Sequence, residues 1–320
     1  MKRTLHRISF GILFLYLSAA AVFARELIPV GEVIGLELSA GTVTVAAFDD
    51  AFSAGRDAGL QIGDEILSID DSRIQCTEDV RRALHHSDGS VELNILRGGR
   101  ETQLRACPQI TDTGPKLGIY LRQGITGIGT VTFYDPQSGK FGTLGHGVND
   151  AHGKLLPMTK GTAYRASVVS VQKGKAGAPG QLKGALDGNS LLGTLSGNTA
   201  RGVFGSAPGS FQGSAIPVAT AEEVRTGAAS IRSTISSGTP REYSVEILKI
   251  YPSDRSDGRN LLIRVTDPTL LNTTGGIVQG MSGSPIIQDG KLIGAVTHVL
   301  VNDPTRGYGI FIENMLDAAA

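Results

Sequence analysis

The sequence predicts a mostly β protein in two units that follow an apolar N-terminal segment. Glycine accounts for 43 of the 320 residues and is scattered, and short apolar runs separated by Gly, Pro, Asn and Asp recur along the chain. Hydrophobic residues make up 40% and charged residues 19%, which is typical of a folded globular protein. Lys plus Arg and Asp plus Glu each total 30, so the charge balance gives no case for nucleic acid as the main partner.

Residues 1–25 have the pattern of an export signal. Lys2, Arg3 and Arg7 precede a run without charge, ISFGILFLYLSAAAVFA, that ends in small residues. The run is 17 residues long, at the short limit of a membrane span, so a cleaved signal peptide and an uncleaved membrane anchor both fit. In either case we expect the remainder of the chain to lie outside the cytoplasm. There Cys76 and Cys107 could pair as a disulfide or stay as two thiols.

Residues 28–108 form the first predicted unit. Two strands, EVIGLEL and GTVTVAAF, are expected to be joined by a tight turn at Ala40-Gly41. A helix is predicted from Thr77 to His86, with Thr77 as its N-cap and two acidic residues in its first turn. The run SVELNILRGG is an alternating strand that turns at its glycines into RETQLRA.

The order of these elements resembles a PDZ domain. Ala58 to Ile66, AGLQIGDEI, matches a signature string of that family, and the run Ile34–Leu38 matches the site where the family binds a peptide carboxylate. The resemblance implies that Gly35, Leu36, Glu37 and Leu38 bind a peptide that is added as a strand. A small β-domain without a ligand is the alternative.

Residues 109–117 read as a linker, and residues 118–320 form the second unit. Short strand-like runs such as ITGIGTVTFYD, ASVVSVQ, YSVEILKIY and LIGAVTHVLV predict an all-β sandwich or barrel. About 200 residues is the size of a pair of six-stranded barrels. The last residues, IENMLDAAA, predict a terminal helix.

The stretch GGIVQGMSGSPI carries the candidate nucleophile. An α/β-hydrolase elbow needs G-x-S-x-G, and neither Ser282 nor Ser284 has glycines at both required positions. The form G-x-S-G-x-P instead resembles the nucleophile loop of chymotrypsin-like serine peptidases. That resemblance makes Ser282 the nucleophile and the backbone N–H groups of Gly280 and Ser282 the oxyanion hole.

A serine hydroxyl needs a general base, and His146 is the best candidate. It lies between glycines directly after a strand-like run, and it precedes Ser282 in the order expected of two barrels. His152 lies in a polar loop and is a weaker choice. His298 lies on the strand after the nucleophile, where it lines a substrate subsite or is a structural core histidine. His85 and His86 end the predicted helix, where a cation is ordinary.

The third catalytic group is not selected by the pattern. Five aspartates lie between the base and the nucleophile: Asp150, Asp187, Asp254, Asp257 and Asp267. There is neither a CxxC motif nor a histidine cluster, so we predict no metal site. Acyl transfer through a serine requires no cofactor.

Several strings together resemble the family of stage IV sporulation protein B, the sporulation serine peptidase of endospore-forming bacteria. They are FGTLGHGV, VTDPTLL and the long run from Gly275 to Leu316. The resemblance implies a catalytic triad of Ser282, His146 and Asp267. It further implies export across the forespore inner membrane into the intermembrane space, self-cleavage, and self-recognition through the PDZ domain.

The same resemblance implies a substrate. Members of the family cut a membrane-bound regulator that restrains an intramembrane metalloprotease. The freed metalloprotease then matures the late mother-cell sigma factor. The alternative from another class is an exported PDZ adaptor with a non-catalytic β-domain. The separation of His146 and Ser282 in the folded chain distinguishes the two.

Overall fold

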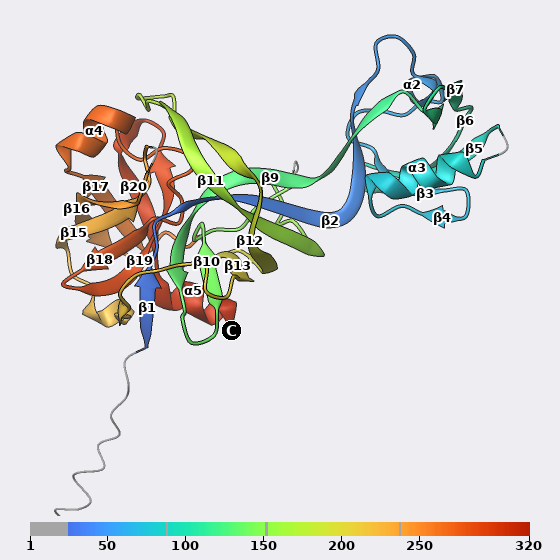
Figure 1. Ribbon diagram of the computed structural model, residues 1–320. Helices are drawn as coiled ribbons and strands as arrows, with labels where there is room; N and C mark the ends of the chain where they lie inside the picture. The colour runs from blue at the N-terminus through green and yellow to red at the C-terminus, as the bar shows by residue number, and fades with distance from the viewer. Residues whose placement is uncertain (1–24, 88, 151–152, 237) are drawn as a thin grey trace, which may run out of the picture.

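The computed structural model describes residues 25–320 except 88, 151–152 and 237 (Figure 1). The predicted signal or anchor therefore lies outside the described residues, apart from Arg25. Within the described part of the chain, none of the helices has the length and apolar character needed to cross a membrane.

Strands dominate the described chain. Its first part contains β1 (Glu26–Pro29), β2 (Val33–Phe48), α2 (Ala54–Asp57), β3 (Glu65–Ile69), β4 (Ser72–Arg73), α3 (Thr77–His85), β5 (Val91–Arg97), β6 (Arg100–Ala106), β7 (Gln109–Thr111), β8 (Gly114–Lys116), β9 (Ile119–Tyr134) and β10 (Lys140–Thr143). The rest contains β11 (Lys160–Gln172), β12 (Gln181–Thr199), β13 (Gly202–Ser206), β14 (Ile216–Pro217), η1 (Ala221–Glu223), β15 (Gly227–Ser233), β16 (Arg241–Ile250), β17 (Leu261–Val265), α4 (Pro268–Thr274), β18 (Pro285–Gln288), β19 (Lys291–Leu300), β20 (Asp303–Phe311) and α5 (Ile312–Ala319).

Two β-barrels lie side by side. In the first barrel the strands follow the order β9, β10, β13, β12, β11 and β2, and a pairing between β2 and β9 closes the ring. The second barrel is closed in the order β15, β16, β17, β20, β19 and β18. Alternating apolar residues fill both interiors, for example Val131, Phe141 and Val203 in the first and Ile263 and Ile286 in the second. The predicted double barrel is thus confirmed, and so is the terminal helix, α5.

A PDZ-like domain extends from the first barrel on two long strands. Its sheet consists of β3, β5, β6 and the distal halves of β2 and β9, and α3 packs on it through Val80, Ala83 and Leu84 (Figure 1). The string AGLQIGDEI has a structural explanation here. Gly63 turns the chain at φ +96°, and the nearly fully buried Asp64 accepts both prongs of the Arg97 guanidinium.

The predicted limits of the first unit, residues 28 and 108, are both wrong. Residues 26–38 belong to the first barrel, where Ile34, Leu36 and Leu38 are core residues. The predicted turn at Ala40-Gly41 is instead an irregularity within the continuous β2, where the pairing with β9 shifts between Leu38 and Val43. The predicted linker, residues 109–117, forms the β7–β8 hairpin and one wall of a groove described below.

Two local predictions in the PDZ-like domain are also corrected. The cap of α3 is Cys76 rather than Thr77, because the extended backbone of Cys76 (φ −145°) precedes the first helical residue. The Asp79 carboxylate accepts from the N–H of Cys76 and closes the capping box. Cys76 and Cys107 are both free thiols.

We expect Asp64→Ala to unfold the PDZ-like domain selectively. The change removes the charged partner of Arg97, which keeps only its hydrogen bond to the Gly59 carbonyl. The cost should be about 2–4 kcal/mol once the partial exposure of Arg97 is taken into account. Hydrogen exchange of β3 and β5 should report the loss, while the second barrel stays protected. Asp257→Ala breaks the exposed pair with Arg255 and is the matched control, which should leave exchange unchanged. Equal exchange in both variants would contradict the structural role of Asp64.

Candidate active site

The nucleophile loop, residues 275–284, is fixed by contacts with both barrels. Thr130 of β9, which is fully buried, donates its N–H to the Ser282 carbonyl (3.0 Å) and its hydroxyl to the Gly280 carbonyl (2.7 Å). At the start of β12, Leu182 donates its N–H to the Gln279 carbonyl, and Gln279 donates to the Gly180 carbonyl. The loop therefore has a defined shape before any substrate arrives.

Glycine is required at two positions of this loop. Gly280 has φ +95° and Gly283 has φ +97°, in the left-handed region that other residues rarely adopt. A Cβ on Gly283 would also lie 2.0 Å from the Thr130 carbonyl oxygen. Among the described residues no acceptor is recorded for the N–H groups of Gly280 and Ser282. Two unpaired donors two residues apart fit the predicted oxyanion hole.

The two serines of the loop have different surroundings. Ser282 is half-buried and lines an open cavity. Ser284 is fully buried, and its hydroxyl donates to the Ser233 hydroxyl at 3.0 Å. Only the Ser282 hydroxyl is therefore placed where a substrate could reach it.

His146 lines the same cavity as Ser282 and Gly280, which has a volume of about 340 Å³. Leu144 and Gly145 both have φ +69° and turn the chain sharply after β10. The His146 Nδ1–H donates to the carbonyl of Gly147 at 2.9 Å, so in the neutral ring Nε2 carries no proton and is free to accept one. Burial lowers the pKa of His146 below its usual value and so favours this neutral form.

The Ser282 hydroxyl is turned away from the base. It donates to the carbonyl of Thr297 on β19 at 2.8 Å, and in the described structure no hydrogen bond joins it to His146. Catalytic hydrogen bonds are often long or absent without substrate, so this rotamer is a resting arrangement. A rotation about χ1 of Ser282 is needed before proton transfer.

Asp267 caps a helix. Its carboxylate accepts from the N–H of Leu270 (2.9 Å) at the start of α4, and Pro268 occupies the first helical position. Across residues 25–320, with the gaps given above, no hydrogen bond or ion pair connects Asp267 with His146. The role of Asp267 as the group that orients His146 stays a prediction, and the Gly147 carbonyl, which is within hydrogen-bond distance of Nδ1, is the alternative orienting group. His152, the weaker base candidate, lies outside the described residues.

Asn198 supports the loop that carries the base, and the sequence did not reveal it. Its amide accepts from the Val148 N–H (2.9 Å) and donates to the carbonyls of Val148 (2.8 Å) and Leu156 (3.0 Å). These three bonds hold the segment directly after His146 and Gly147. A partner 50 positions away along the chain gives no local signal.

His298 lies beside the base. The centroids of the His146 and His298 rings are 5.2 Å apart, with the planes tilted by 39°. Burial, reinforced by nearby His146, lowers the pKa of His298 to about 4. Its Nδ1 is buried and has no hydrogen-bond partner among the described residues. Its role in a substrate subsite stays a prediction.

The predicted peptide-binding residues do not form a peptide site. Gly35, Leu36, Glu37 and Leu38 pair with β9 on one side and with β11 on the other, so no strand edge is left there for a ligand. Leu36 and Leu38 instead form walls of the cavity beside Ser282. The Glu37 carboxylate accepts a hydrogen bond from the Tyr164 hydroxyl (3.0 Å).

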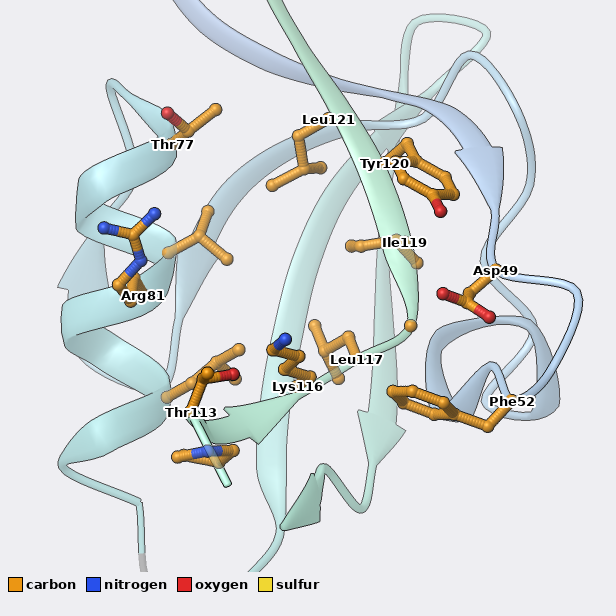
Figure 2. Close-up of a pocket in the computed structure, with 14 residues that line it drawn as sticks. Asp49, Phe52, Thr77, Arg81, Thr113, Lys116, Leu117, Ile119, Tyr120 and Leu121 are labelled. Carbon is orange, nitrogen blue, oxygen red and sulfur yellow. The ribbon is translucent and has the colours of Figure 1, made fainter. Parts of the chain in front are cut away.

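The groove of the PDZ-like domain lies between α3 and residues 113–121 and has a volume of about 770 Å³ (Figure 2). Thr77 and Arg81 line it from the helix, and Ile119 and Leu121 line it from β9. Among the described strands, β2 alone pairs with residues 119–123 of β9, so the edge that faces α3 is free. Leu117-Gly118-Ile119 at this edge has the same apolar-Gly-apolar pattern as Ile34-Gly35-Leu36, where the carboxylate-binding site was predicted. The structure places the groove at the later of the two segments.

With this geometry established, comparison with known proteins identifies the family. The SpoIVB peptidase S55 family matches residues 114–316, and a PDZ domain matches residues 50–97. The chain belongs to the SpoIVB peptidase S55 family. It is a serine endopeptidase with a PDZ domain.

Two curated proteins are similar to a smaller part of the chain. The protein of Agrobacterium fabrum named "Putative zinc metalloprotease Atu1380" is 33% identical over 100 residues, which is 31% of this chain and 26% of that protein. A Rhizobium meliloti protein named "Putative zinc metalloprotease R01501" is 33% identical over 111 residues, 34% of this chain and 29% of that protein. The chain thus spans about a quarter to a third of the length of these curated relatives.

Two solved structures are also similar. The active form of Rv3671c protease from M. tuberculosis is 16% identical, covers 61% of this chain and 73% of its own, and has a TM-score of 0.34. An HtrA-type protease, AlgWS227A with decapeptide, is 10% identical, covers 90% of this chain and 62% of its own, and has a TM-score of 0.39.

The pH dependence of catalysis should reflect the burial of His146. Protonated His146 cannot accept the Ser282 proton, and burial disfavours that charged form, so activity should persist below the usual histidine pKa of about 6.5. We expect kcat/KM to rise with pH through a midpoint below this value.

The same two histidines should make the stability of the fold depend on pH. As the pH falls, the unfolded chain takes up protons on His146 and His298 before the folded chain does. The free energy of unfolding should therefore decrease as the pH is lowered from about 6.5 towards about 4. Circular dichroism at each pH separates the two effects, and a rate midpoint above 7 would contradict the assignment.

Asp267→Ala should remove the cap of α4 and lower the free energy of unfolding by about 1 kcal/mol. Asp267→Asn keeps an oxygen acceptor for the Leu270 N–H and should retain both the stability and a kcat within about tenfold, since Gly147 already holds the His146 proton. Thermal unfolding and peptide hydrolysis are measured for both variants. A stable Asp267→Asn variant with kcat lower by about 10⁴-fold would instead establish Asp267 as the orienting carboxylate.

Proposed function

We propose that this serine endopeptidase acts in sporulation, outside the cytoplasm, by cleaving itself and a membrane-bound regulator of an intramembrane metalloprotease. Cleavage of that regulator leads to maturation of the late mother-cell sigma factor. Membership of the SpoIVB peptidase S55 family supports the proposal, together with the export pattern of residues 1–25. The observation that carries the chemistry is the shared cavity of Ser282, His146 and Gly280.

The geometry suggests the following sequence of steps. The Ser282 hydroxyl turns from the Thr297 carbonyl towards His146, whose unprotonated Nε2 accepts the proton as Oγ attacks the peptide carbonyl. The N–H groups of Gly280 and Ser282 receive the oxyanion. His146 then gives the proton to the leaving amine, and water, activated by the same imidazole, hydrolyses the acyl-enzyme.

The groove of the PDZ domain binds a peptide by strand addition to β9. The free edge at residues 119–123 and the apolar walls formed by Val80, Leu84 and Ile119 support this role. Lys116 adds a positive charge beside the turn at Gly118, which suits a terminal carboxylate. The peptide is a segment of the substrate or of a second copy of the chain, and in both cases the groove raises the local concentration of the protein to be cut.

Family membership favours the enzyme over the non-catalytic adaptor. The resting position of the Ser282 hydroxyl does not reverse this conclusion, because Ser282 and His146 line one cavity and catalytic hydrogen bonds are often absent without substrate.

We expect Ser282→Ala to lower peptide hydrolysis by at least about 10⁴-fold, since the residual rate comes from binding and the oxyanion hole alone. Ser284→Ala is the matched control. It removes one buried hydrogen bond to Ser233, at a cost of about 1 kcal/mol, and should keep most activity. Self-cleavage of the full chain and labelling by a fluorophosphonate are the two readouts. Normal self-cleavage by Ser282→Ala would show that the nucleophile is misassigned.

A further inference from the structure

The cavity beside Ser282 is apolar on most of its walls. Leu36 and Leu38 of β2 form one side, and Ile125 and Ile128 of β9 form the adjacent side. Leu144, which precedes the base loop, closes a further part of the wall. The volume of about 340 Å³ is sufficient for a large amino-acid side chain.

The position of the cavity relative to the reacting atoms shows which part of a substrate it receives. The substrate carbonyl must lie at Ser282 with its oxygen at Gly280, and the leaving amine must lie next to His146. We expect the acyl part of the substrate to follow the β19 edge beside the nucleophile, where the Thr297 carbonyl accepts from the Ser282 hydroxyl. None of residues 297–299 lines the cavity. His146, Gly147 and Val148 do line it. The cavity therefore lies on the leaving-group side of the bond.

We propose that this cavity is the subsite for the first residue after the cleaved bond, and that it selects a large apolar side chain such as Leu, Ile, Met or Phe. The proposal rests on the assignment of Ser282 and His146 as nucleophile and base. Such a side chain is removed from water in this cavity, and its burial stabilises the complex. The cavity thus determines where the enzyme cuts.

A strand edge beside the cavity can hold the substrate backbone. Residues 125–129 of β9 pair with β2, and no other described strand pairs with them. An extended leaving-side segment can add to this edge, and alternate side chains then point into the cavity. The apolar pocket and the free backbone groups together recognise one residue in a fixed register.

Gly127 makes the subsite testable. It lines the cavity, its backbone is not in the left-handed region, and a Cβ at this position would meet no atom within 4 Å. A larger side chain can therefore stand in the open space without disturbing the fold. Gly127→Leu should occupy the subsite and exclude large substrate side chains.

Thr126→Leu is the matched control. Thr126 is the preceding residue of β9 and is exposed, and its side chain points to the opposite face of the strand. It adds an apolar group of the same size outside the cavity. The pair of variants thus separates filling of the subsite from a general change of β9.

The experiment incubates the full chain and both variants with a proteome-derived peptide library and identifies the new N-termini by mass spectrometry. We expect the unchanged chain and Thr126→Leu to produce N-termini enriched in Leu, Ile, Met and Phe. Gly127→Leu should lower cleavage before these residues by about tenfold to a hundredfold and leave cleavage before Gly, Ala and Ser. Absence of apolar enrichment in the unchanged chain, or an identical profile in Gly127→Leu, would overturn the proposal.

Labelling by a fluorophosphonate separates this failure from failure of the enzyme function. The probe reacts with Ser282 and carries no peptide on the leaving side, so Gly127→Leu should be labelled at the rate of the unchanged chain. An enzyme that is labelled and cleaves without apolar preference contradicts the subsite alone. A chain that is neither labelled nor cleaves the library contradicts the catalytic assignment and, with it, the subsite.

Discussion

The active site depends on two hydrogen bonds made by one threonine. Thr130 lies in the part of β9 that belongs to the first barrel. It donates to the carbonyls of Gly280 and Ser282, which belong to the second barrel. These bonds fix the backbone of the loop at both residues, whose N–H groups have no hydrogen-bond acceptor among the described residues. Gly283 fits against the Thr130 carbonyl so closely that a Cβ could not be accommodated. The base comes from the first barrel and the nucleophile from the second, and this contact brings them to one cavity.

The strand that carries Thr130 also connects the active site with the peptide groove. Residues 119–123 of β9 form the free edge of the groove, and Thr130 holds the nucleophile loop. Between them, Ile125, Gly127 and Ile128 line the cavity. β2 accompanies β9 over this whole distance, with a shift of register between Leu38 and Val43 (Figure 1). Gly124 stands opposite that shift with φ +76°, and a Cβ there would lie 2.2 Å from the Leu38 carbonyl oxygen. The two sites are therefore joined by a continuous pair of strands with one irregular point between them.

Ser282 and His146, which the structure brings to one cavity, could be selected from the sequence because the signals around them are local. The glycines around Ser282 and His146 mark sharp turns, and turns of this kind depend on the backbone of a few residues. The peptide site could not be found in the same way, because Ile34-Gly35-Leu36 and Leu117-Gly118-Ile119 have the same local pattern. Their difference is the number of strand neighbours: residues 34–36 have one on each side, and residue 119 has one side free. Asn198 is a comparable case, since its partners at Val148 and Leu156 are set by the closure of the barrel.

The resting position of the Ser282 hydroxyl connects substrate binding with reactivity. The Thr297 carbonyl that accepts this hydroxyl lies on the strand edge along which the acyl part of a substrate is expected to pair. A carbonyl that accepts from a peptide N–H is a poorer acceptor for the serine, and both donors compete for the same space. Arrival of a peptide therefore weakens the bond that keeps the hydroxyl away from His146. Because the Gly147 carbonyl holds Nδ1 of His146 and Thr130 holds the loop, release of the Ser282 hydroxyl is the change that this arrangement still requires before the two residues can act together.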